Sequence, residues 1–168
     1  LAKGRPFGFL DHNLRCGDSL LGIHRLDQLT ELSMTPGGRV QRRLFGQNIE
    51  RAVNEVIALR LVLREMPIHD IHDVEAMARI DADARRHLHI PEQIADAFIG
   101  EIFNPSGRTA LDSIAIEAGQ AIDGNQAASD SIKRRAFTAL SVDVPIGRSA
   151  RRPFHWPLEF PEVFITSN

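Results

Sequence analysis

The densest group of side chains that could do chemistry is the segment HDIHD, which runs from His69 to Asp73. His69, His72 and Asp73 lie three to four residues apart, so they can share one face of a helix as metal ligands do. A metal-dependent phosphohydrolase built on His69, Asp70, His72 and Asp73 would need further His and Asp ligands, and no such partner signature stands out. We therefore expect no metal site: Asp70 should cap a helix whose first turn is solvated.

A second candidate is a turn near the N-terminus, in the segment FLDHNLRCGDSLLG from Phe9 to Gly22. Asp18 follows the short stretch NLRCG and is flanked by Gly17 and Ser19. A carboxylate in a turn at the end of a strand can accept a hydrogen bond from a ligand. Gly-Asp-Ser is equally a common surface turn, so the residue types alone leave both interpretations open.

The segment NPSG, from Asn104 to Gly107, invites comparison with the Asn-Pro-Pro-aromatic catalytic loop of amino-methyltransferases. Ser106 stands where that loop has its second proline, and Gly107 stands where it has the aromatic residue. The remaining pattern is that of a helix terminator, so we expect no catalytic site there.

The composition is that of a globular protein, with 43% apolar and 25% charged residues and a formal net charge of −2. One Cys cannot form an internal disulfide and fits a reducing compartment, and no apolar run approaches the roughly 20 residues of a membrane span. We expect a cytoplasmic protein that does not enter a membrane. The sequence starts at Leu1 without the features of a signal peptide, so we also expect it to be part of a larger protein.

Helical periodicity dominates residues 39–141. Apolar residues recur every three or four positions from Phe45 to Met66, and similar stripes cover residues 70–88, 111–122 and 129–140, the last after a possible Ser cap. Pro91 is expected to open a further short helix that ends at NPSG. The sequence therefore predicts a mainly α protein, an antiparallel bundle of about five helices, with short extended or β flanks at residues 1–38 and 142–168.

The C-terminal flank contains the run RPFHWPLEFPEVF, from Arg152 to Phe164. Pro153, Pro157 and Pro161 exclude a helix interior and a central strand, because proline lacks an N–H and restricts the residue before it. We expect an extended segment that its side chains hold in place. Its two acidic residues, Glu159 and Glu162, should be solvated or paired with the nearby Arg151 and Arg152.

Together, LDHNLRCGDSLLG and RPFHWPLEFPEVF resemble the methylase region of type IIG restriction-modification enzymes and of related methyltransferases of phage-defence systems. The resemblance implies that both flanks belong to a Rossmann-like catalytic domain and that the helices form an insertion in it. It also implies that Asp18, with Gly17 and Ser19 as turn neighbours, contacts the adenine of S-adenosylmethionine. The lead-in to the catalytic loop would be packed by Phe154, His155, Trp156, Phe160 and Phe164.

The resemblance implies that the parent protein is a site-specific, adenine-N6 DNA methyltransferase that acts on double-stranded DNA, with or without a fused nuclease. The Gly-rich cofactor loop and the Asn-Pro-Pro-aromatic loop of that family are not in these 168 residues. We therefore expect no catalytic residue here, an inactive chain when alone, and no tight binding of S-adenosylmethionine. A dimer of the isolated chain would come from unpaired flanks. The rival hypothesis is a stand-alone helical module that binds another protein.

Overall fold

The computed structural model describes residues 14–35, 45–67, 69–107 and 109–164. These residues contain seven helices and, apart from one isolated bridge, no β structure. In chain order the helices are α1 (Leu26–Glu31), α2 (Gly46–Glu65), α3 (Ile71–Phe103), α4 (Ala110–Ile122), α5 (Gln126–Leu140), α6 (Trp156–Glu159) and α7 (Pro161–Phe164). The predicted mainly α class is confirmed. In the described ranges, no helix combines the length and the apolar character of a membrane span.

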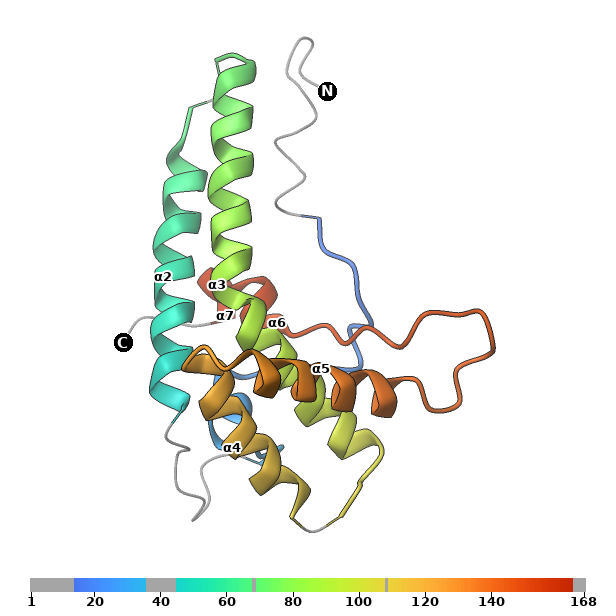
Figure 1. Cartoon of the computed structure of the whole chain (residues 1–168). Coiled ribbons are helices and arrows are strands. Elements are labelled where there is room, and N and C mark those ends of the chain that lie inside the picture. The colour runs from blue at the N-terminus through green and yellow to red at the C-terminus, as the bar shows by residue number, and fades with distance from the viewer. Residues whose placement is uncertain (1–13, 36–44, 68, 108, 165–168) are drawn as a thin grey trace.

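Helices α2 and α3 run side by side in opposite directions and form the long hairpin of Figure 1. Ile49, Val56 and Leu63 of the predicted apolar stripe lie in the core on the buried face of α2, and Val53, which is not part of that stripe, is buried with them. The predicted helix over residues 45–66 is thus confirmed. Burial of this face, rather than helix propensity, supplies most of the stability of such an element.

The prediction that Pro91 opens a separate short helix is wrong, because α3 continues through it for 33 residues. An interior proline removes one backbone hydrogen bond and costs about 3 kcal/mol. Here the cost is offset by buried apolar residues on both sides, among them Leu88, Ile94 and Phe98. The first half of α3 packs along α2, and its second half carries α4 and α5, so one helix joins both parts of the core.

Helices α4 and α5 lie across the second half of α3 (Figure 1). A β-carbon on Gly100 would lie 3.0 Å from Cβ of Ala139, so small residues permit the close approach of α3 and α5. The expected Ser cap at residue 129 is wrong. The cap of α5 is Asn125, whose side chain accepts from the Ala128 N–H at 3.2 Å. Ser129 is instead buried and donates its hydroxyl to Gln93 at 2.9 Å.

The expected extended C-terminal segment is only partly present. Residues 151–155 are non-helical, but Trp156–Glu159 and Pro161–Phe164 each form one helical turn. Pro157 lies in the first turn of α6, and Pro161 is the first residue of α7. At such positions the missing N–H has no helical partner to lose, which is why prolines that forbid a helix interior still permit these turns.

Candidate functional site

The two segments that carry the resemblance lie side by side although they come from opposite ends of the chain (Figure 1). Asp18 and Pro153 form a parallel β-bridge. The Asp18 N–H donates to the Arg152 carbonyl at 2.7 Å, and the Phe154 N–H donates to the carbonyls of Asp18 at 3.1 Å and Leu21 at 2.7 Å. The sequence places these residues in two motifs, and the backbone hydrogen bonds join them into one unit.

Two glycines allow this approach. A β-carbon on Gly22 would lie 2.2 Å from the Phe154 carbonyl oxygen, and one on Gly17 would lie 3.1 Å from Cδ2 of the Phe154 ring. The sequence pattern identified Gly17 only as a turn neighbour of Asp18 and indicated no role for Gly22. The signal that could have identified them is a glycine at each end of a short turn, where another backbone comes close.

Asp18 itself is exposed, together with Gly17 and Ser19. One carboxylate oxygen of Asp18 accepts the Leu20 N–H at 3.0 Å, which closes the turn. The Ser19 carbonyl accepts from the Trp156 indole N–H at 3.4 Å, so the turn is also held from the C-terminal segment. The arrangement presents a carboxylate at the surface on a backbone that is fixed on both sides. Such a group can accept a hydrogen bond from an amino group of a ligand.

His155 has a more specific place than the packing role implied by the resemblance. Its side chain is 4% exposed, its Nε2 lies 3.0 Å from Oδ1 of Asp96 on α3, and its Nδ1 accepts the Ile23 N–H at 3.4 Å. Sequence reasoning missed Asp96, because nothing local marks a helix carboxylate whose partner is distant in the chain.

The other aromatic residues of the lead-in pack on one another. The Phe154 ring lies 4.8 Å from the Trp156 ring and 6.2 Å from the Phe160 ring, and the Trp156 ring lies 5.4 Å from the Phe164 ring, between centroids. Phe154 is buried, Trp156 and Phe160 are half-buried, and Phe164 is exposed. These contacts stiffen the segment through favourable ring packing.

The predicted partners of the two glutamates are wrong. Arg15, whose side chain is 4% exposed, contacts Oε2 of Glu159 at 3.2 Å and Oδ1 of Asp81 at 3.1 Å. Arg60 donates to the Glu159 carbonyl at 2.6 Å and contacts Glu162 at 3.2 Å. Burial lowers the pKa of Arg60 more than the nearby charge of Glu162 raises it. The Arg15 and Arg60 ion pairs thus tie the C-terminal turns to α2, α3 and the N-terminal segment, whereas the sequence favoured arginines that are neighbours in the chain.

Glu92 lies beside this network on α3. Burial, together with the charges of Glu159 and Asp96, raises its pKa to about 7 against the opposing effect of Arg152 and Arg85. A carboxyl group that titrates near neutral pH is unusual, and strong shifts of this kind also occur in structural charge networks.

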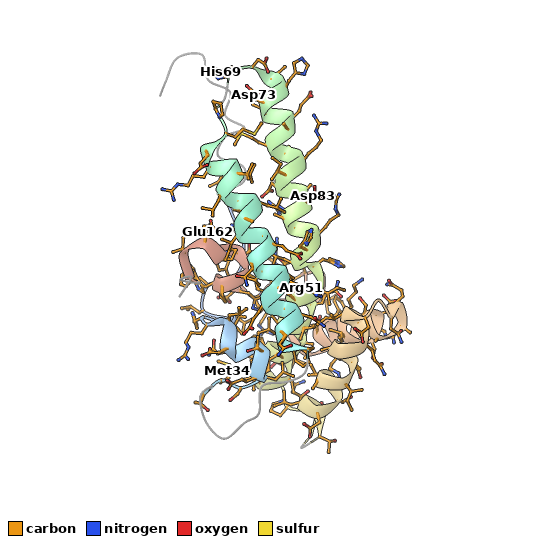
Figure 2. All side chains as sticks on the ribbon, turned by 90° about the vertical axis from the view of Figure 1, so that its left-hand side faces the viewer. Met34, Arg51, His69, Asp73, Asp83 and Glu162 are labelled. Atoms are coloured by element: carbon orange, nitrogen blue, oxygen red, sulfur yellow. The ribbon has the colours of Figure 1, made fainter. Side chains whose placement is uncertain are left out.

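The HDIHD segment forms the helix start that the sequence predicted. Asp70 is the N-cap of α3, and its carboxylate accepts the N–H groups of His72 at 2.8 Å and Asp73 at 3.2 Å. Hydrogen bonds from the backbones of His69 and Asp70 lower the pKa of Asp73. Figure 2 shows His69 and Asp73 at the free end of the α2–α3 hairpin, away from Glu162. Across the described ranges, no three His, Cys, Asp or Glu side chains converge as metal ligands would.

The NPSG segment also ends a helix, as predicted. Asn104 is the C-cap of α3, with its N–H bonded to the Gly100 carbonyl at 2.9 Å. Ser106 folds back so that its N–H and hydroxyl bind the buried Glu101 carboxylate at 2.5 and 2.7 Å. Both hydrogen-bond donors of Ser106 thereby hold the loop.

Two surface hollows lie away from Asp18. One, of about 380 Å³, is lined by α2, α3 and Ile122, with the His87–Glu55 ion pair at 2.8 Å on its wall. The other, of about 350 Å³, lies between the Asn104–Ser106 loop and α5. Neither of these two hollows is lined by a residue of the two motifs.

Comparison of the chain with models of protein families, with curated proteins and with solved structures found no match.

Proposed function

We propose that this chain is part of an S-adenosylmethionine-dependent DNA adenine-N6 methyltransferase of a restriction-modification or phage-defence system. The observation that carries the proposal is the hydrogen-bonded pairing of Asp18 with Pro153. The residues that resemble the cofactor-contacting segment and those that resemble the lead-in to the catalytic loop lie at opposite ends of the sequence. Their direct pairing supports the proposal, because two segments of one catalytic domain would lie in the same folded unit.

Asp18 is the residue that we propose for the cofactor contact. Its exposed carboxylate is a hydrogen-bond acceptor on a fixed turn, and the exocyclic amino group of adenine is a donor, so the two are complementary. The rest of the cofactor site, including a Gly-rich loop, would come from other parts of the same protein. When bound, S-adenosylmethionine supplies the methyl group.

The helices α2 to α5 are, in this proposal, an antiparallel helical insertion that braces the catalytic domain and takes no part in its chemistry. Arg15, Arg60 and His155 contribute contacts between these helices and the flanks. Arg15 contacts both Asp81 on α3 and Glu159, Arg60 on α2 donates to the Glu159 carbonyl, and His155 contacts Asp96 on α3. Double-stranded DNA is the proposed substrate of the whole protein. A flipped adenine would be held by an Asn-Pro-Pro-aromatic loop outside these 168 residues.

The proposal is tested with the full-length product of the natural gene. We expect it to transfer labelled methyl groups from S-adenosylmethionine to the N6 position of adenine in unmethylated duplex DNA. Asp18→Ala should raise KM for S-adenosylmethionine by roughly 10- to 100-fold, the loss expected for one hydrogen bond to a charged group. Asp123→Ala is the matched control, because Asp123 is another exposed acid, at the end of α4, and should leave KM unchanged.

Absence of methyl transfer by the wild-type protein across a library of DNA sequences would reject the proposal and favour a helical module that binds another protein. Methyl transfer with an unchanged KM in Asp18→Ala would retain the enzyme but remove Asp18 from its cofactor site.

A further inference from the structure

His155 connects helix α3 to the backbone of Ile23, which follows the turn that carries Asp18. The imidazole lies between Asp96 on α3 and the backbone of Ile23, which is five residues after Asp18 in the sequence. Its side chain is 4% exposed, whereas that of Asp96 is 37% exposed. The ring is therefore enclosed, and its carboxylate partner stands at the edge of the core.

The two contacts fix which nitrogen carries the proton. Nδ1 lies 3.4 Å from the Ile23 nitrogen, and a backbone N–H can only donate, so Nδ1 must accept and carry no hydrogen. Nε2 then carries the proton and donates it to Oδ1 of Asp96 at 3.0 Å. A carboxylate that holds an imidazole in one tautomer also fixes the direction of the ring.

The contact matters for the turn because Ile23 is completely buried. Without His155 its N–H would lie in the core without an acceptor, which costs the desolvation energy of that group. The Ile23 carbonyl accepts the Trp156 N–H at 3.1 Å, so Ile23 is bound on both sides by consecutive residues of the C-terminal segment. This double attachment fixes the position of the backbone directly after the turn from Asp18 to Gly22.

We propose that His155 is a positioning residue for Asp18, and that Asp96 orients it from the helical part of the protein. Asp96 holds the ring, the ring holds the Ile23 backbone, and the Ile23 backbone fixes the turn that presents the Asp18 carboxylate. The role of Asp18 in cofactor binding rests on the proposed function. The mechanical link from Asp96 to the turn does not.

The first test uses nuclear magnetic resonance of the 168-residue chain and needs no activity. We expect the wild-type His155 ring to be the neutral tautomer with the proton on Nε2. Asp96→Leu removes the acceptor, and we expect a mixture of tautomers, shifted amide signals from residues 18–23, and Ile23 amide hydrogen exchange that is roughly tenfold or more faster. Asp96→Asn keeps an oxygen acceptor and should restore the single tautomer and slow exchange.

Asp83→Leu is the matched control, since Asp83 lies on the same helix (Figure 2) and its partner is Arg86 within that helix. It should leave His155 and the turn unchanged. His155→Phe, which keeps a ring of similar size without nitrogen atoms, should reproduce the effect of Asp96→Leu on Ile23. Should Asp96→Leu fail to fold, His155→Phe and the tautomer of the wild-type ring still decide the question.

The second test is kinetic and uses the full-length protein. Asp96→Leu should raise KM for S-adenosylmethionine several-fold and leave kcat within a factor of about two, because it misplaces a binding group rather than a reacting one. Unchanged Ile23 exchange and an unchanged tautomer in Asp96→Leu would overturn the positioning role whatever the activity. A disturbed turn with no effect on KM would show that the link exists but would remove Asp18 from the cofactor site, as an unchanged KM in Asp18→Ala would.

Discussion

Gly22 lies so close to Phe154 that a β-carbon on Gly22 would sit 2.2 Å from the Phe154 carbonyl oxygen. The Phe154 N–H donates at 2.7 Å to the carbonyl of Leu21, the residue before this glycine. The contact is between two backbones, so no side chain can rotate away to make room. It holds the N-terminal and C-terminal segments together at the turn that carries Asp18.

Gly22→Ala should therefore destabilise the protein strongly. Overpacking of a tight contact typically costs about 1–3 kcal/mol, and here a backbone would have to move, so we expect a loss of about 3 kcal/mol in the free energy of unfolding. Urea denaturation followed by circular dichroism measures it. Gly119→Ala is the control: nothing lies within 4 Å of a β-carbon there, and an alanine inside α4 should stabilise by about 0.5–1 kcal/mol. Equal effects of the two substitutions would contradict the structure.

Arg15→Met should cost about 3 kcal/mol or more, because it leaves Asp81 and Glu159 partly buried without their shared cation. Burial raises the pKa of Asp81, and bonds and charges from Arg85 and Arg15 outweigh it to give a lowered value. Loss of Arg15 should move that pKa upward, which carbon NMR of the carboxyl group would detect. Arg25→Met, at an exposed pair with Asp27, should change stability by less than about 1 kcal/mol. A similar small effect for Arg15→Met would mean that its pairs do not hold the termini.

Glu92 should make stability depend on pH near neutrality. Its pKa is raised from 4.5 to about 7 in the folded protein, so the unfolded chain releases this proton at lower pH than the folded one. The stability that Glu92 contributes is complete below pH 4.5 and is lost as the pH rises through about 7. Glu92→Gln should therefore raise the free energy of unfolding at pH 8 by about 3 kcal/mol and change it little at pH 4.

Urea titrations at several pH values would measure this difference, with Glu65→Gln as the control at an exposed position at the end of α2. A Glu92→Gln profile parallel to that of the wild type would show that Glu92 titrates normally.

Asp70→Ala should cost about 1 kcal/mol, the usual contribution of an N-cap. His69→Ala should leave stability nearly unchanged, because His69 joins this turn through its backbone N–H. A metal centre predicts instead that His69→Ala has the larger effect. The purified protein would then hold stoichiometric zinc or manganese, and His69→Ala would lose it. Metal analysis together with urea denaturation of both variants separates the two hypotheses.

Local sequence patterns were sufficient for those elements whose cause is local. The stripe of α2, the Asp123–Gly124 stop after α4 and the Asp70 cap all follow from the spacing of a few neighbouring residues. The exposed turn at Asp18 was also predictable from the sequence, because Gly-Asp-Ser favours a turn. In each case the physical preference acts within one or two helical turns of the chain.

The sequence by itself thus determined a mainly helical protein and the two terminal segments in which a site could lie. Only the tertiary structure decided that α3 passes through Pro91 and that Pro157 and Pro161 lie in the first turns of helices. It also decided that Arg15 and Arg60 are the partners of Glu159 and Glu162. The reason is the same throughout. A proline or an unpaired charge has a local cost, and whether that cost is accepted depends on burial and partners that come from distant parts of the chain.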